Sequence, residues 1–229
     1  MRHAGTAFLM MKNRLQRYLS ERTAMLAGVS HDLRTPLTRL KLQLSLLPEE
    51  DSIKEMMQDV DDMENMLNGY LAFAREEGRE DSKEILLTPF VINLVDKFRK
   101  TNHAIELKIQ KDVSVVGRPT DLSRALGNLV ANASRYATQT WIRIVKKQDT
   151  VQITIDDNGP GIPKNKRQEV FKPFVRLEES RNPTTGGVGL GLTIARDILL
   201  SHGGDISLDV SPQKGLRVLV TLPLFKKTK

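Results

Sequence analysis

The sequence contains no cysteine, and it contains no apolar run long enough to cross a membrane. Disulfide bonds and cysteine–metal sites are therefore excluded, which fits a cytosolic compartment. A membrane-spanning helix needs about 20 mainly apolar residues. The apolar run nearest the start covers only residues 7–11, which is also too short for a secretory signal. The chain as given is expected to fold in water without crosslinks.

Acidic residues are outnumbered, with 28 Asp and Glu against 35 Lys and Arg, which gives a net charge of +7. Such an excess can serve binding to nucleic acid or to an anionic membrane surface. The basic residues are scattered, however, and the one dense run is at residues 226–229. Acidic partners, including nucleotide phosphates, explain the balance equally well, so no nucleic-acid binding is expected.

A polar segment divides the 229 residues into two parts. This length suits two modest domains. Residues 76–83 carry no apolar period, which is typical of a linker. We predict a helical arm over residues 1–20, a helical domain over 21–77, a linker over 78–84 and a second domain over 85–226.

An apolar repeat of three and four residues runs through the first part and predicts an antiparallel helical hairpin. The first helix is expected from residue 4 to Pro48, with a seam of Leu33, Leu37, Leu40, Leu44 and Leu47. The second helix is expected over residues 53–74. A two-helix hairpin buries too little apolar surface alone, so a dimeric four-helix bundle is the expected arrangement. The alternative is that the hairpin packs on the domain that follows.

One histidine lies in a polar stretch of the first helix, Ser30-His31-Asp32-Leu33-Arg34-Thr35-Pro36-Leu37. At roughly 100° per residue, His31 lies about 200° from Leu33 and is expected to face away from the seam. A neutral imidazole is a nucleophile, and a carboxylate such as Asp32 on its other nitrogen would raise its basicity. Thr35 shares the helix face of His31. The alternative is an ordinary histidine beside a helix charge.

From residue 84 onward the pattern changes to short strands and helices. Strands are expected at 85–87, 105–109, 113–116, 141–145, 151–155, 206–210 and 216–220, and helices at 89–100, 120–137 and 191–201. We expect Thr120 or Pro119 to cap the second of these helices. Helices and a mixed sheet in this order predict a two-layer α/β sandwich, so the fold class is multidomain, α followed by α+β.

Two asparagines lie on one side of the helix predicted over residues 120–137. Asn128, Asn132, Arg135 and Tyr136 share this side. An amide oxygen suits Mg²⁺ that is already bound to phosphates, and Arg135 can meet phosphate oxygens. The alternative is that these are polar residues on a core helix.

A carboxylate follows the strand at 151–155, in the stretch Asp156-Asp157-Asn158-Gly159-Pro160-Gly161-Ile162. A carboxylate at a strand end can accept a hydrogen bond from the adenine amino group, and the glycines let the backbone approach the flat base. The alternatives are an ordinary turn or a calcium loop. No glutamate follows at the EF-hand distance, which disfavours the calcium loop.

Two further stretches frame a long loop. Phe171-Lys172-Pro173-Phe174 is typical of an aromatic hinge, and Gly186-Gly187-Val188-Gly189-Leu190-Gly191-Leu192 opens a helix, where backbone N–H groups suit phosphates. The loop between them is long enough for an active-site lid. No Gly-Lys-Ser/Thr follows the glycines and no strand–turn–helix unit surrounds them, which excludes a Walker loop and a dinucleotide fingerprint.

The octet around His31 resembles the phosphoacceptor box (HisKA domain) of the bacterial two-component sensor histidine kinases, and it is most similar to the osmosensor, or EnvZ, type. The order and spacing of the four later stretches resemble the N, G1, F and G2 boxes of the family's ATP-binding domain. That domain has the GHKL (Bergerat) fold, which gyrase and MutL share. The resemblance covers about residues 20 to 225. One departure is Val188, where many members carry threonine or serine.

The resemblance implies ATP-dependent phosphorylation of His31, with Asp32 as the base. It also implies transfer to an aspartate of a response-regulator receiver domain, and phosphatase activity toward that regulator supported by Thr35. Asn132 is expected to coordinate Mg²⁺ and Asp157 to read adenine. The full set of predicted ATP or ADP contacts is Asn128, Asn132, Arg135, Tyr136, Asp157, Gly159, Gly161, Ile162, Phe174, Gly187, Val188, Gly189, Leu190, Gly191 and Leu192.

The resemblance further implies a homodimer that forms the cytoplasmic portion of an inner-membrane receptor, with residues 1–20 at the end of a membrane-proximal module. Two other functions fit parts of the pattern. A dimeric scaffold or phosphatase with an inactive nucleotide domain is disfavoured by the intact Asn132 and Asp157. An ATPase of the gyrase type is disfavoured by the histidine box on a helical hairpin.

Overall fold

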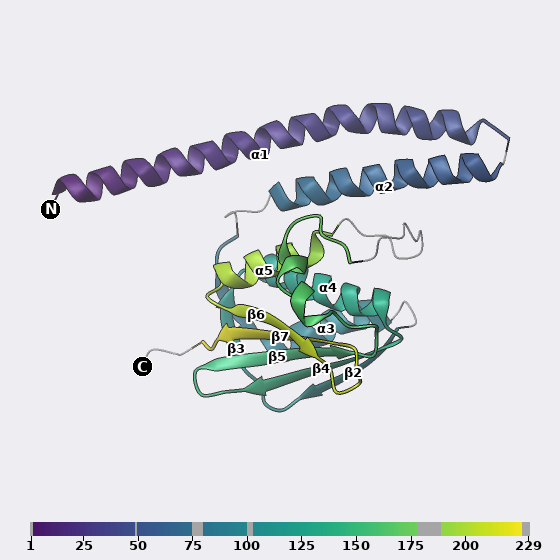
Figure 1. The fold of residues 1–229 in the computed structure, drawn as a ribbon. Helices are drawn as coiled ribbons and strands as arrows, with labels where there is room; N and C mark the ends of the chain where they lie inside the picture. The colour runs from purple at the N-terminus through teal and green to yellow at the C-terminus, as the bar shows by residue number, and fades with distance from the viewer. Residues whose placement is uncertain (1, 49, 75–79, 100–102, 178–188, 226–229) are drawn as a thin grey trace. The chain divides into compact units, whose positions relative to one another are not determined.

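The computed structural model describes residues 2–48, 50–74, 80–99, 103–177 and 189–225. The chain divides into two compact units, one that comprises Met1–Arg79 and one that is built from Glu80–Thr185 and Gly189–Lys229. The first unit is helical, and the second combines helices with a mixed sheet (Figure 1).

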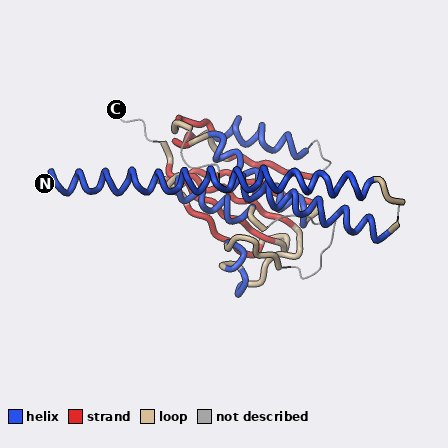
Figure 2. The backbone as a smooth tube through the Cα atoms, turned by 90° about the horizontal axis from the view of Figure 1, so that it is seen from above, coloured by secondary structure: helices blue, strands red, loops and turns tan. Residues whose placement is uncertain are grey.

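Two antiparallel helices make up the first unit. Helix α1 covers Arg2–Ser45 and α2 covers Asp51–Ala74, and the two lie side by side (Figure 2). Pro36 lies inside α1, where it supplies no N–H to the turn that holds His31. The predicted helical hairpin is confirmed.

The hairpin leaves much of its apolar seam exposed. Leu37 and Val60 are buried, whereas Leu33 and Leu40, one turn to either side of Leu37, are each 46% exposed. The other exposed apolar side chains of the hairpin include Met25, Val29, Leu47, Met56 and Met63. One hairpin therefore covers only part of the seam that its sequence provides.

The second unit alternates strands and helices along the chain. Its elements are β1 (Lys83–Leu86), α3 (Leu87–Arg99), β2 (Ala104–Ile109), β3 (Ser114–Gly117), α4 (Pro119–Tyr136), β4 (Gln139–Lys146), β5 (Thr150–Asp157), η1 (Lys164–Lys166), η2 (Glu169–Phe171), α5 (Gly191–Ser201), β6 (Asp205–Val210) and β7 (Leu216–Pro223). The short 3₁₀ helices η1 and η2 were not part of the sequence prediction.

The main sheet has the strand order β2-β4-β5-β7-β6. Strand β2 is parallel to β4, and the other neighbouring pairs are antiparallel. Helices α3, α4 and α5 cover one face of this sheet (Figure 1), and β1 pairs with β3 in a separate two-stranded sheet. This arrangement confirms the predicted two-layer α/β sandwich with a mixed sheet.

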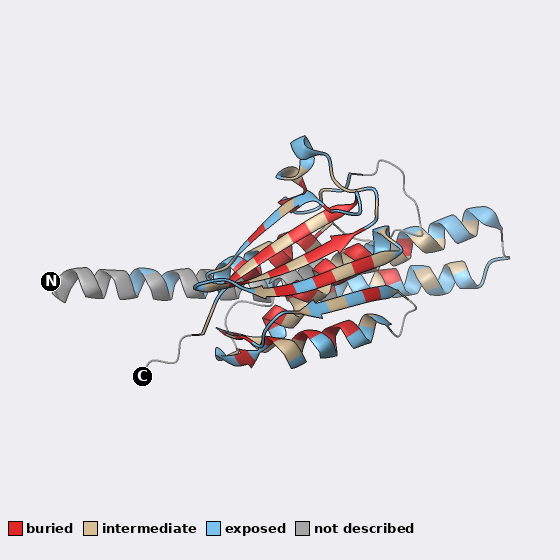
Figure 3. Ribbon diagram, turned by 90° about the horizontal axis from the view of Figure 1, so that it is seen from below, coloured by how far each residue is buried: buried red, intermediate tan, exposed pale blue. Residues whose placement is uncertain are grey.

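The core lies between the sheet and its helices. Buried and more exposed residues alternate along the strands (Figure 3), because successive side chains of a strand point to opposite faces. Ile153 and Ile155 of β5 are buried, as are Leu126 and Leu129 of α4. Asp157 continues the same buried alternation at the end of β5. The pattern that builds the core therefore places a carboxylate at the C-terminal end of this central strand.

The start of α4 differs from the prediction. The N-cap position is Arg118, without a side-chain capping hydrogen bond, and Pro119 occupies the first turn. The prediction of Thr120 or Pro119 as the cap was therefore wrong. The backbone N–H of Thr120 donates instead to the carboxylate of Glu80 at 2.9 Å, so a residue 40 positions away in the sequence satisfies this helix end.

The core packing of α4 gives a direct test of the fold. We expect Leu129→Ala to lower the free energy of unfolding by about 2–5 kcal/mol, because it opens a cavity at a fully buried site. The same truncation at exposed Leu86 should change it by less than about 0.5 kcal/mol. Urea unfolding measures both, and equal effects of the two substitutions would contradict this placement of α4.

Candidate functional site

The phosphoacceptor stretch lies in the middle of α1. His31 is part of this helix, and its side chain lies outside the described ones. Ser30 is buried, whereas Asp32, Arg34 and Thr35 are exposed. The stretch therefore offers a carboxylate and a hydroxyl where a second protein or domain can reach them.

Asp157 is the buried carboxylate at the end of β5. Its Oδ1 accepts hydrogen bonds from the backbone N–H groups of Gly159 and Leu216, both at 2.9 Å. Within the part of the chain that the structure describes, no donor is bound to Oδ2. Burial raises the pKa of Asp157 and Asp156 adds to this, whereas the two N–H groups and His103 oppose it. One oxygen is thus fixed by the backbone and the other is open to a ligand.

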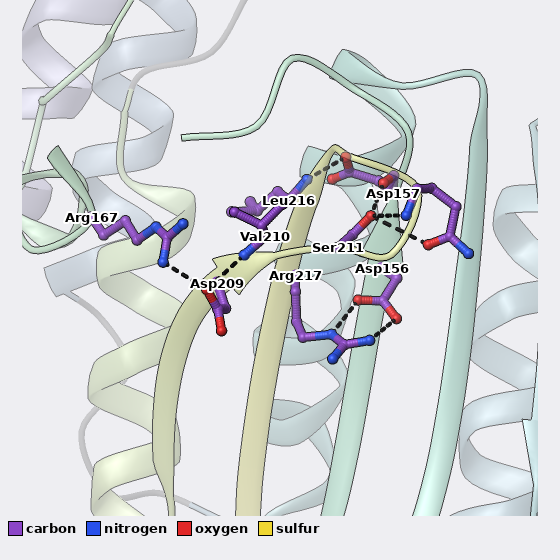
Figure 4. A network of polar contacts seen from close by, with 9 residues as sticks. Asp156, Asp157, Arg167, Asp209, Val210, Ser211, Leu216 and Arg217 are labelled. Carbon is purple, nitrogen blue, oxygen red and sulfur yellow. Dashed lines mark hydrogen bonds and ion pairs between the residues drawn. The ribbon is translucent and has the colours of Figure 1, made fainter. Parts of the chain in front are cut away.

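The neighbouring carboxylate has a different partner. Asp156 forms a two-point ion pair with Arg217, with N–O distances of 2.7 and 2.8 Å, and Arg167 pairs with Asp209 at 2.8 Å on the adjoining strand β6 (Figure 4). Because Asp156 is already paired with the guanidinium of Arg217, Asp157 is the aspartate of the two that can accept a hydrogen bond from a ligand.

Helix α4 carries the four predicted residues of the asparagine stretch. Asn128 and Asn132 are half-buried, and Arg135 and Tyr136 are exposed. The Nδ2 of Asn128 is buried and has no hydrogen-bond partner among the residues that the structure describes. A buried amide without a partner is costly, so this donor is suited to an acceptor that a bound ligand supplies.

Contacts at two glycines join this helix to two of the glycine stretches. A Cβ atom at Gly159 would lie 2.7 Å from the carbonyl oxygen of Tyr136, at the end of α4. At Gly191, the first residue of α5, a Cβ atom would lie 3.8 Å from Cβ of Asn128. The structure thus brings together the predicted N, G1 and G2 stretches.

The aromatic stretch meets the last glycines before α5. The backbone N–H of Phe174 donates to the carbonyl of Gly189 at 3.0 Å. Gly189 has φ of +71°, and a Cβ atom there would lie 2.9 Å from the carbonyl carbon of Phe174. Phe174 itself has φ of +65°, a conformation that non-glycine residues rarely adopt. The two segments that frame the loop are therefore held tightly together at their ends.

Helix α5 begins without a side-chain cap from its N-cap residue. Its N-cap residue, Leu190, makes no side-chain capping bond, and the first N–H groups of a helix have no partner inside the helix. The side chains of Leu190 and Leu192 are buried in the core, so these two residues can offer only backbone groups to a ligand. Gly187 and Val188 lie outside the described residues.

The G1 loop is fixed at its far end as well. Gly161 has φ of +69°, and a Cβ atom there would lie 3.2 Å from the carbonyl oxygen of Gly215. The carbonyl of Ile162 accepts a hydrogen bond from Arg167 Nε at 3.2 Å. Both ends of the loop from Asp157 to Ile162 are therefore supported by other parts of the chain.

Sequence reasoning missed the contribution of the turn between β6 and β7. Ser211, Gly215 and Leu216 all contact Asp157, although they lie more than 50 residues away in the chain. Gly215 in a strand connection is the one weak signal in the sequence, and it is equally typical of an ordinary hairpin turn.

Two family models match the chain. Residues 117–226 match the family of histidine kinase-, DNA gyrase B- and HSP90-like ATPases, and residues 21–79 match the His kinase A (phospho-acceptor) domain. The first match contains α4, the G1 loop and α5, and the second contains His31. The similarity to the osmosensor type in particular stays a prediction.

The curated relatives that match the chain include sensor histidine kinases. The chain is 33% identical over 217 residues to the sensor histidine kinase GtrS of Pseudomonas aeruginosa, which covers 95% of this chain and 45% of that protein. It is 32% identical over 242 residues to the sensor histidine kinase CpxA of Escherichia coli, which covers 98% of this chain and 52% of that protein. The chain thus spans about half the length of these relatives.

Solved structures match either most of the chain or a smaller part of it. The ATP-binding domain of PrrB from Mycobacterium tuberculosis matches with a TM-score of 0.54 and 28% identity, covering 64% of this chain and 100% of that one. Full-length ShkA in complex with AMPPNP matches with a TM-score of 0.67 over 90% of this chain and 46% of that one. At 19% identity, the second match concerns the fold alone.

The raised pKa of Asp157 has a consequence for stability. A carboxyl whose folded-state pKa is raised contributes stability that is fully present below its unfolded-state pKa and is lost as the pH rises through its folded-state pKa. We therefore expect Asp157→Asn to stabilise the protein at pH 7, and we expect this gain to shrink as the pH is lowered through the raised pKa.

The adjacent residue provides the matched control. Asp156→Asn removes the ionised partner of Arg217 and should cost about 1–3 kcal/mol at pH 7. Denaturant unfolding from pH 4 to 8 measures both variants. A loss of stability in Asp157→Asn that grows with pH would contradict the raised pKa of this buried carboxyl.

Proposed function

This chain belongs to the two-component sensor histidine kinases, and we propose that it uses ATP to phosphorylate His31 and then passes the phosphoryl group to an aspartate of a response-regulator receiver domain. The observation that carries the proposal is the pairing within one chain of a phospho-acceptor domain match around His31 and an ATPase domain match around Asp157. Because the chain spans about half of its curated relatives, the activity of the whole protein is part of this proposal.

The nucleotide is held by the second unit. Oδ2 of Asp157 accepts a hydrogen bond from the exocyclic amino group of adenine, while Gly159 and Gly161 let the backbone approach the base. The phosphates face the uncapped start of α5, whose N–H groups and dipole suit anions. Arg135 and Tyr136, exposed at the end of α4, flank the same ligand, and Phe174 and Gly189 form the base of the lid.

A magnesium ion fits this site only together with the nucleotide. Among the residues that the structure describes, no group of three or more His, Asp or Glu could hold a metal ion. The α4 side that carries Asn128, whose Nδ2 finds no partner in the described part of the chain, also carries Asn132. A neutral amide oxygen is a suitable ligand for an ion already bound to phosphates. We assign Asn132 this role. When bound, the ion neutralises phosphate charge.

The phosphoryl step needs a neutral imidazole. One ring nitrogen of His31 attacks the γ-phosphorus, an N–P bond forms, and the bond from that phosphorus to the bridging oxygen breaks, so that ADP leaves. Asp32 takes the proton from the other ring nitrogen, which keeps the attacking nitrogen nucleophilic. Both groups lie on α1, where the side chains of Asp32 and Thr35 are exposed.

The acceptor helix also serves the later steps. The receiver aspartate attacks the phosphorus of phosphorylated His31, so an acyl phosphate forms and the N–P bond breaks. Thr35, exposed one turn after His31, orients water for hydrolysis of the phosphorylated regulator. This phosphatase activity uses the same surface as the transfer.

A homodimer accounts for the exposed seam of the hairpin. Leu33 and Leu40 lie in register with buried Leu37, yet each is nearly half exposed in one chain. Pairing two hairpins into a four-helix bundle buries these side chains. None of the described helices is long and apolar enough to cross a membrane. The relatives are about twice as long, and we propose that this chain is the cytoplasmic kinase portion of an inner-membrane receptor.

The acceptor role is tested by labelling with γ-³²P-ATP and Mg²⁺. We expect His31→Gln to abolish acid-labile labelling and to keep ADP binding, because the nucleotide site lies in the other unit. His3→Gln, the same substitution elsewhere in α1, should label as the wild type does. Labelling that survives in His31→Gln would remove His31 from its role. Absent labelling in the wild type with normal ADP binding would favour the scaffold alternative.

The dimer is tested separately. Leu40→Glu buries a charge in the proposed seam and should shift the protein to monomers in analytical ultracentrifugation. Leu42→Glu is the control, because Leu42 is 62% exposed and lies off the seam. Equal sedimentation of the two variants would contradict a dimer built on this seam.

A further inference from the structure

The turn between β6 and β7 packs directly against the carboxyl end of β5. Ser211 is 4% exposed, and its hydroxyl donates to the backbone carbonyl of Asp157 at 2.6 Å. The hydroxyl oxygen of Ser211 also accepts a hydrogen bond from the backbone N–H of Gln213 at 3.0 Å. Figure 4 shows this serine between the turn and the strand that carries Asp157.

The turn has a fixed shape of its own. The backbone N–H of Ser211 donates to Gly215, and that of Lys214 donates to Ser211. Lys214 has φ of +69°, a rare conformation for a residue with a side chain. This strained position and the internal hydrogen bonds define one conformation of the turn.

The turn touches Asp157 at two further points. A Cβ atom at Gly215 would lie 2.3 Å from both the carbonyl oxygen and Oδ1 of Asp157, so only glycine fits there. The next residue, Leu216, donates its N–H to the same Oδ1. Three contacts therefore hold Asp157. The serine hydroxyl binds its backbone carbonyl, Gly215 packs against its carbonyl oxygen and Oδ1, and the N–H of Leu216 binds Oδ1.

We propose that Ser211 is a positioning residue that sets the preference of this site for adenine. By tying the backbone of Asp157 to the turn, it keeps Oδ1 on the N–H of Leu216 and leaves Oδ2 aimed at the exocyclic amino group of the base. This inference rests on the proposed function, in which Asp157 reads adenine. Ser211 itself need not touch the nucleotide.

A matched pair of nucleotides isolates this effect. Inosine diphosphate has a carbonyl where ADP has the amino group, so it cannot donate a hydrogen bond to Oδ2 from that position. One charge-assisted hydrogen bond corresponds to about a 10- to 100-fold preference for ADP over inosine diphosphate in the wild-type chain. Isothermal titration with Mg²⁺ and the full chain measures both affinities.

We expect Ser211→Ala to lower the preference for ADP over inosine diphosphate to about threefold or less, mainly by weakening the binding of ADP. Ser211→Thr keeps the hydroxyl and should restore the preference. Ser207→Ala removes an exposed hydroxyl from the same hairpin and should bind both nucleotides as the wild type does. Ser211→Cys nearly keeps the side-chain volume but offers a weaker hydrogen-bond donor. It should lose the preference as Ser211→Ala does, and it provides the test if the alanine variant fails to fold.

The outcomes separate the two proposals. If the wild type does not prefer ADP, the adenine contact of Asp157 fails, and the role of Ser211 fails with it. If the wild type prefers ADP and Ser211→Ala and Ser211→Cys keep the same ratio, Ser211 is not a positioning residue and the proposed function stands. If the affinities for both nucleotides fall by the same factor in the Ser211 variants, the serine has only a structural role, and the inference is overturned as well.

Discussion

The candidate site depends on one buried carboxylate that is only half satisfied. Asp157 receives two backbone N–H groups on Oδ1 and none from the described residues on Oδ2. A buried charge is costly unless it is paired, and its raised pKa is the sign of that cost. The fold bears this cost at the edge of its core, which is the expected signature of a group kept ready for a ligand.

The rest of the second unit serves to hold this group in place. Strand β5 ends at Asp157, α4 brings its carbonyl end against Gly159, and the β6–β7 turn presses Gly215 against the carboxylate. On the opposite face, Arg217 neutralises Asp156. Two adjacent aspartates therefore have separate tasks, because alternation along the strand sends them to opposite sides of the sheet.

Much of this could be predicted from the sequence, because its signals are local. The leucine spacing of α1, the alternation in β5 and the glycines beside Asp157 each act within a few residues. The contacts that the sequence did not reveal are long-range: Glu80 meets the start of α4 from 40 residues away, and Ser211 reaches Asp157 across 54. Their residue types are ordinary, so only the folded chain gives them meaning. Roles that require a ligand or a second chain, such as those of Asn132 and Leu40, stay predictions.

The central claim is that Oδ2 of Asp157 accepts a hydrogen bond from the exocyclic amino group of the bound base. A hydrogen bond to the charged form lowers the pKa of a carboxyl, so the free and bound states must titrate differently. The most direct measurement is the carboxyl ¹³C shift of Asp157 as a function of pH, with and without ADP. The account predicts that ADP brings the raised pKa of this group down. Saturation with ADP that leaves the titration of Asp157 unchanged would contradict it.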